Sequence, residues 1–134
     1  MKRVLMTMLL GLATVSLVTG CGEKEKEKPK DDIKVNTNEE VIKDQTLGVY
    51  EFKNTSLIYE NGTSLLETTV TNTSATVVNP VEFKILVKDA EGNLMTTLTG
   101  FVGIAMQPNE SRLISSYSGD DLSKAASIEY QIVQ

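Results

Sequence analysis

The stretch Val81-Glu82-Phe83-Lys84-Ile85-Leu86-Val87-Lys88-Asp89 decides the fold of this chain. Apolar side chains recur at every second position, polar or charged ones stand between them, and only Leu86 is out of step. Successive side chains of an extended chain point to opposite faces, so this period of two predicts a strand with one buried face. Such a strand needs partners that bury the same kind of face.

The residues on either side of this strand indicate how it is connected. Residues 89–93 read as a turn, in which Gly92 is free to take a positive φ. Residues 94–104 then form the returning strand, and Gly100 and Gly103 suggest a bend or a bulge in it. Upstream, residues 72–80 read as a connection that ends at Pro80, because proline cannot donate a hydrogen bond to a central ladder.

The same alternation with turn punctuation extends over residues 47–134. The dipeptide Asn61-Gly62 lies between two β-like runs and predicts a hairpin. Residues 119–126 are expected to form a single helical turn capped by Asp120 or Asp121. The expected strands are 47–53, 56–60, 64–72, 81–89, 94–104, 112–118 and 127–133.

Seven short strands in 88 residues predict an all-β fold, namely an antiparallel, seven-stranded, immunoglobulin-like sandwich. The Cys…Trp…Cys core of true immunoglobulin domains is missing, so the pattern predicts only the architecture. The alternative fold is a small barrel.

Composition excludes several classes of function. Residues 47–134 carry 5 basic and 10 acidic side chains, and an acidic domain with few aromatic residues repels nucleic acid. The chain has no His, so the usual catalytic triads and imidazole zinc sites are excluded. Its one Cys cannot form an intramolecular disulfide, and stability must come from packing.

A family resemblance covers about residues 56–133. It is carried by Asn72-Thr-Ser, by the strand from Val81 that ends in Asp89-x-Glu-Gly92-Asn93, and by Met106-x-Pro108-x-Glu110-Ser111. This layout resembles the FxLYD-type sandwich domains of bacterial surface proteins, although Lys88 stands where the family name has Tyr. The resemblance implies an extracytoplasmic interaction module without established chemistry.

The N-terminus predicts export and lipid attachment. A basic start and a mostly apolar run over 4–18, too short to span a bilayer, indicate a signal peptide over residues 1–20. The sequence Leu17-Val18-Thr19-Gly20-Cys21 resembles the bacterial lipobox. The resemblance implies cleavage between Gly20 and Cys21, and diacylglycerol on the Cys21 sulfur. Two acyl chains anchor a protein stably, whereas one does not. The alternative is an exposed free thiol at Cys21.

Residues 21–46 are expected to be the lipidated cysteine and a charged, flexible linker, with the sandwich domain at 47–134. Residues 22–46 carry 6 Lys and 8 acidic residues around Pro29 and bury too little apolar surface to order themselves. Within this linker, residues 39–44 are a candidate for one short helical turn.

The sequence predicts no catalytic residues, no metal site and no cofactor. Asp89, Glu91 and Asn93 alternate like the start of a calcium loop, but Leu94 and Gly100 stand where Gly and Glu are needed. Adjacent Ser123 and Lys124 rarely face one point, and the Asp120–Asp121 pair is better explained by capping. Tyr117, among serines, is a candidate for an exposed protein contact.

These observations predict a non-enzymatic lipoprotein on the outer face of the cell membrane, held by lipid on Cys21. Gly22 and the Lys/Glu-rich tether favour a Gram-positive envelope. The sandwich is expected to bind a protein or cell-envelope partner through loops or by strand addition, and not nucleic acid. The alternative is a lipoprotein that binds a metal or a small ligand through acidic loops.

Overall fold

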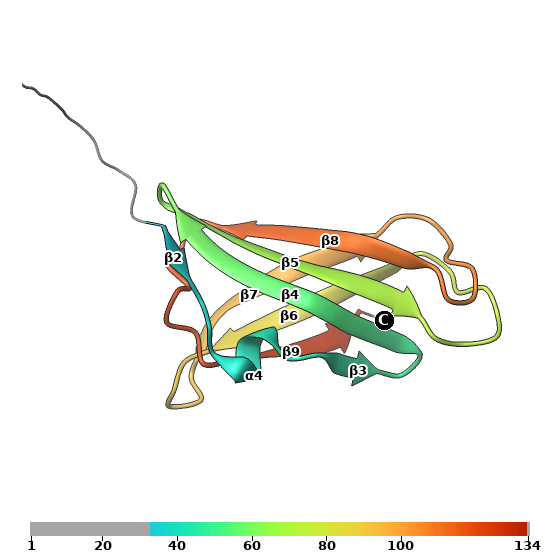
Figure 1. Ribbon diagram of the computed structural model, residues 1–134, viewed down its shortest axis with the longest axis horizontal. Coiled ribbons are helices and arrows are strands. Elements are labelled where there is room, and N and C mark those ends of the chain that lie inside the picture. The colour runs from blue at the N-terminus through green and yellow to red at the C-terminus, as the bar shows by residue number, and fades with distance from the viewer. Residues whose placement is uncertain (1–32, 134) are drawn as a thin grey trace, which may run out of the picture. The chain divides into compact units, whose positions relative to one another are not determined.

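The computed structural model describes residues 33–133, which form a two-layered antiparallel β structure (Figure 1). The larger sheet has the strand order β2-β4-β5-β8, with β3 also paired to β4, and the smaller sheet has the order β7-β6-β9. One short helix, α4, lies among them. The elements are β2 (Lys34–Val35), α4 (Glu39–Ile42), β3 (Gln45–Leu47), β4 (Tyr50–Glu60), β5 (Thr63–Asn72), β6 (Val81–Lys88), β7 (Leu94–Val102), β8 (Ser111–Ser118) and β9 (Ser127–Ile132).

The all-β sandwich prediction is confirmed, and the pairing order explains its type. In the larger sheet β5 lies between β4 and β8, and in the smaller one β6 lies between β7 and β9. If β4 to β9 are lettered A, B, C, C′, E and F, the sheets read A–B–E and C′–C–F, which is an immunoglobulin-like layout. The chain therefore crosses between the layers after β5, after β7 and after β8.

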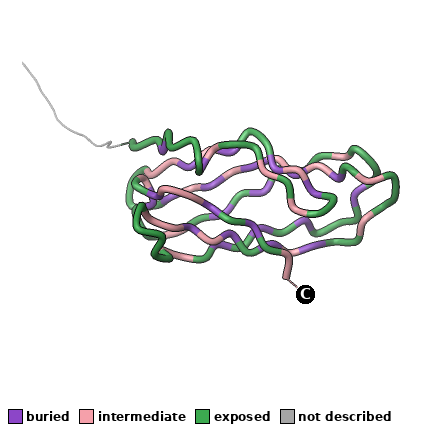
Figure 2. The backbone as a smooth tube through the Cα atoms, turned by 90° about the horizontal axis from the view of Figure 1, so that it is seen from below, coloured by how far each residue is buried: buried purple, intermediate pink, exposed green. Residues whose placement is uncertain are grey.

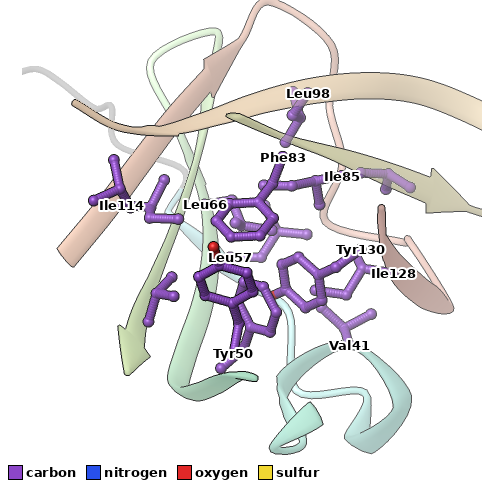
Figure 3. Close-up of a cluster of buried hydrophobic side chains, with 14 of the residues drawn as sticks. Val41, Tyr50, Leu57, Leu66, Phe83, Ile85, Leu98, Ile114, Ile128 and Tyr130 are labelled. Carbon is purple, nitrogen blue, oxygen red and sulfur yellow. The ribbon is translucent and has the colours of Figure 1, made fainter. Parts of the chain in front are cut away.

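The central strand behaves as its alternation predicts. The four β6 side chains at 81, 83, 85 and 87 are buried, and Phe83, Ile85 and Val87 have no exposed surface. After the exposed Thr63, strand β5 alternates in the same way between buried and half-buried residues. Buried residues alternate with less buried ones along the extended segments of the domain (Figure 2). Apolar residues from both sheets meet between the layers in one cluster (Figure 3).

Aromatic contacts order the middle of this core. The ring of Phe52 in β4 stacks on that of Tyr130 in β9, with ring centres 3.8 Å apart and planes within 4°. Phe83 meets Phe52 and Tyr50 edge-on, at 5.2 and 5.0 Å. Edge-to-face pairs add to the free energy that burial alone supplies. Burial also raises the pKa of the Tyr130 hydroxyl above its ordinary value.

The expected count of seven strands was wrong. Two of the expected strands form one continuous strand, and two further strands that were not expected lie before residue 50. Segments 47–53 and 56–60 belong to the single strand β4, whose register shifts between Lys53 and Ser56. Asn54 takes a φ of +57° there, so a bulge replaces the expected break. Strands β2 and β3 bring the total to eight in residues 33–133.

The expected domain boundary at residue 47 was also wrong, and the compact unit begins at Ile33. Residues 34–47 form β2, α4 and β3, and Val41 of α4 is completely buried in the core. The candidate helical turn at 39–44 is confirmed as α4, capped by the Asn38 side chain. The remainder of the expected linker, residues 22–32, lies outside the described residues.

This N-terminal segment closes the side of the sandwich between β4 and β9. The Gln45 side-chain amide donates to the Ile128 carbonyl of β9 at 3.1 Å. The side-chain amide of the buried Asn36 donates to the Ala125 carbonyl at 2.9 Å. Val41 fills the space between the layers from the same side, as the position of α4 beside β9 shows (Figures 1 and 3). Val41 in the core and Ile42 packed against it are therefore apolar residues of a charged run that contribute to the fold.

The opposite side of the sandwich is closed by direct contact between β7 and β8. The Ser116 hydroxyl donates to the Thr99 carbonyl at 2.5 Å. Gly100 of β7 lies so near β8 that a Cβ there would be 2.7 Å from Ile114 Cγ2. Gly100 therefore permits a close approach of two strands, and the register shift in this hairpin lies instead between Val87 and Lys88.

Candidate functional site

The two turns at the β2 end of the domain are built by short polar side chains. Asn61 and Gly62 have φ values of +55° and +83° and join β4 to β5, which confirms the predicted hairpin. The turn after β6 is also confirmed: Gly92 has a φ of +85°, and Asp89 Oδ1 accepts from the amides of Glu91 and Asn93. The residues compared with a calcium loop are therefore held as a turn.

The loop between β8 and β9 lies at the same end and contains no helical turn, contrary to expectation. Asp121 instead accepts from the Ser123 hydroxyl and amide, at 2.6 and 2.9 Å, and pairs with Lys34 at 3.2 Å. These contacts, with the Ser123 hydroxyl first, lower the pKa of Asp121 from 3.8 to about 2. The Ser123 hydroxyl is thereby bonded to Asp121 and not to Lys124, whose side chain is exposed.

The outer face of the larger sheet carries an apolar row that crosses four strands. Val35 of β2 is opposite Ile58 of β4, Ile58 is opposite Leu65 of β5, and Leu65 is opposite Tyr117 of β8. Directly opposed residues have their side chains on the same face of a sheet. We call Val35, Ile58, Leu65 and Tyr117 the outer row.

The outer row is open to solvent at both ends. Val35 is 57% exposed and Tyr117 is 69% exposed, while Ile58 and Leu65 are half-buried. A hollow of about 390 Å³ lies along the row and is lined by Ile58, Glu60, Asn61, Thr63, Leu65 and Tyr117. The candidate contact residue Tyr117 is therefore exposed, as expected, and it stands beside an open hollow.

Strand β8 supplies a second apolar side chain to this face and is itself an edge. Leu113, two positions before Ser115 on the outward face, is 62% exposed. Strand β8 ends the larger sheet and runs along the upper margin of the view in Figure 1. Within residues 33–133, its main chain makes one hydrogen bond other than those to β5, from the Arg112 guanidinium to the Ser111 carbonyl.

The connections at the opposite end of the domain are joined by one buried side chain. Asn72 is completely buried, and its amide nitrogen donates to the carbonyls of Thr76, Met106 and Gln107 at 2.8–3.2 Å. Its Oδ1 accepts from the Ser74 amide and hydroxyl at 2.9 and 2.7 Å. One side chain thus ties the β5–β6 connection to the β7–β8 connection. The gap between them is also bridged by Val78 and Met106.

The predicted lipidation and cleavage residues, Cys21 and Gly20, lie outside the described residues. Within 33–133, no group of three or more His, Cys, Asp or Glu side chains is placed to hold a metal ion. Among the same residues, no helix is long and apolar enough to cross a membrane.

Sequence reasoning identified Tyr117 but missed the rest of the outer row. A signal was present, since Leu57-Ile58 and Leu65-Leu66 place apolar residues on both faces of β4 and β5. Val35 gave no such signal, because its neighbours read as linker.

No family model, curated protein or solved structure matches this chain. The resemblances to the lipobox and to FxLYD domains therefore stay predictions.

Proposed function

We propose that this chain is a membrane-anchored extracytoplasmic lipoprotein whose sandwich is a non-catalytic interaction module. It binds a protein or cell-envelope partner through the outer row and the hollow beside it. The observation that carries the proposal is an apolar row across four strands that ends in an exposed tyrosine. Tyrosine is enriched in binding surfaces because its ring supplies apolar area and its hydroxyl supplies a hydrogen bond.

The position of the row relative to the tether supports this assignment. Lys34 of β2 pairs with Tyr59 of β4, next to Ile58 of the outer row. From Cys21 to Lys34 the chain spans 13 residues, which reach at most about 45 Å. A lipid on Cys21 would hold the row within that distance of the bilayer, about half the reach expected from a linker that ends at residue 46.

Two measurements test the proposal separately. Cys21→Ser should move the protein from the membrane fraction to the soluble fraction, and retention in the membrane would contradict the lipid anchor. A photocrosslinking amino acid at Tyr117 in intact cells should give a discrete adduct with a molecule other than a second copy of this chain, while the same probe at exposed Thr97 of β7 should not.

The adduct should weaken when Val35→Lys places a charge in the outer row. Val35 is exposed, so this variant leaves the core intact. Equal adducts from both probe positions, or an adduct indifferent to Val35→Lys, would contradict binding at this face.

A further inference from the structure

Strand β8 is a long strand that ends the larger sheet, and within residues 33–133 the free side of its main chain receives no hydrogen bond from another strand. The free side of β4 is paired with β2 and β3. At the edge of β9 the Ile128 carbonyl accepts a hydrogen bond from the Gln45 side-chain amide, and at the edge of β7 the Thr99 carbonyl accepts one from the Ser116 hydroxyl. Strand β8 contacts β7 through the inward-facing side chains of Ile114 and Ser116, and in residues 33–133 no main-chain hydrogen bond joins the two strands. Its free main-chain groups are therefore a template for another strand.

The usual protections of an edge strand are missing from β8. Proteins commonly block such edges with lysine, proline or a bulge. Strand β8 has neither residue, and it pairs with β5 without interruption over Ser111–Ser118. Its single charge, on Arg112, is balanced by an ion pair with Glu110.

The side chains of β8 are arranged symmetrically about Ser115. Leu113 and Tyr117 lie two residues to either side of it on the outer face, 62% and 69% exposed. An antiparallel copy of the strand centred on Ser115 would place Leu113 opposite Tyr117 of the other copy, twice. Apolar and aromatic residues opposite one another stabilise strand pairs.

We propose that β8 pairs with β8 of a second copy of this chain, antiparallel and about a two-fold axis at Ser115. The axis is perpendicular to the sheet, so the contact is self-complementary and closes at two copies. Residues 112–118 would form about six to eight main-chain hydrogen bonds. Within them Arg112 faces Ser118, so no like charges oppose each other.

This pairing deepens the proposed function, because it joins two outer rows into one continuous face. The inference rests on the proposed function in one respect, namely that the lipid anchor would concentrate the two copies on one membrane. Confinement to one bilayer raises the effective concentration of a weak pair. The pairing geometry itself depends only on β8.

The register can be tested by disulfide crosslinking of the full chain in its membrane. With the axis at Ser115, the two Ser115 Cα atoms would be about 4.5–5.5 Å apart, within the range of a disulfide. The two Leu113 Cα atoms would be more than about 13 Å apart, four residues out of register, which is too far. Leu113 is a matched control because it is exposed on the same face of the same strand.

Under a mild thiol oxidant, Ser115→Cys should give a disulfide dimer at least tenfold more abundant than that from Leu113→Cys. Leu113→Cys combined with Tyr117→Cys should restore the dimer, because these positions would face each other. Adding Leu113→Lys to Ser115→Cys should reduce it severalfold. Equal dimer from Ser115→Cys and Leu113→Cys, or no dimer from either Ser115→Cys or the double variant, would overturn the proposal.

The parent chain separates this result from the anchor. A thioether at Cys21 cannot form a disulfide, so an unaltered chain that gives no disulfide dimer agrees with lipidation. A disulfide dimer of the unaltered chain would count against the anchor and leave the comparison between Ser115→Cys and Leu113→Cys as the test of β8.

Discussion

Gly100 of β7 and Ile114 of β8 lie so close that there is no room for a Cβ between them: an added Cβ would lie 2.7 Å from Ile114 Cγ2. Ile114 is buried and β-branched, so its side chain has little freedom to move aside. This contact sets how closely the two sheets approach on the β7–β8 side.

Gly100→Ala is therefore expected to lower the free energy of unfolding by about 1–3 kcal/mol, the usual cost of overpacking a core. Urea unfolding followed by tyrosine fluorescence measures it, since the chain has no Trp. Gly119→Ala is the control, because a Cβ there meets open space and its φ is not positive. Equal stability of the two variants would show that β8 can shift freely.

Asn72→Ala should destabilise the domain by about 2 kcal/mol, because it removes a fully buried side chain that bridges the carbonyls of Thr76, Met106 and Gln107 and leaves a cavity in its place. The exposed Asn93→Ala should change stability by less than about 0.5 kcal/mol. Asn72→Asp should be worse at neutral pH than at pH 4, since a carboxylate there faces carbonyl oxygens. A pH-independent Asn72→Asp would contradict this account of the network.

Val41→Ala should lower the free energy of unfolding by about 2 kcal/mol, because it removes two buried methyl groups and leaves a cavity. Val35→Ala, six residues earlier and 57% exposed, should cost less than about 0.5 kcal/mol. Urea midpoints of the two variants give the comparison. If both behaved like the parent chain, residues 34–47 would not be part of the cooperative fold.

Stability should fall between about pH 4 and pH 2, partly through Asp121. Its pKa is 3.8 in the reference state and about 2 in the fold, so the folded state prefers the carboxylate. The contribution is present above the higher value and is lost as the pH falls through the lower one. Asp121→Asn or Ser123→Ala should flatten the dependence of Tm on pH in this window. Part of the pH dependence should remain in both variants, because a hydrogen bond from the Gln107 backbone amide also lowers the pKa of Glu110.

An unchanged slope in both variants would contradict the role given to the Asp121–Ser123 contacts. The measurement belongs at low ionic strength, because salt screens the additional contribution of Lys34 to an exposed carboxylate.

The amino-acid sequence by itself determined the local structure wherever a short-range pattern specifies it. The alternation in Val81–Lys88 predicted the central strand, and Asn61-Gly62 predicted the hairpin, because strand faces and positive-φ turns depend on adjacent residues. The same reasoning failed at residues 119–126, where Asp121 bonds to Ser123 in a turn without forming a helix.

Only the tertiary structure decided what depends on residues far apart in the chain. Val41 is buried because β4 and β9 leave a space that it fills, and no pattern near residue 41 records those strands. The outer row likewise exists because pairing aligns Val35, Ile58, Leu65 and Tyr117, and a shift of one residue would turn the shifted strand's side chain inward. Register is a property of paired strands, so neither the row nor the free edge of β8 could be read from any single segment.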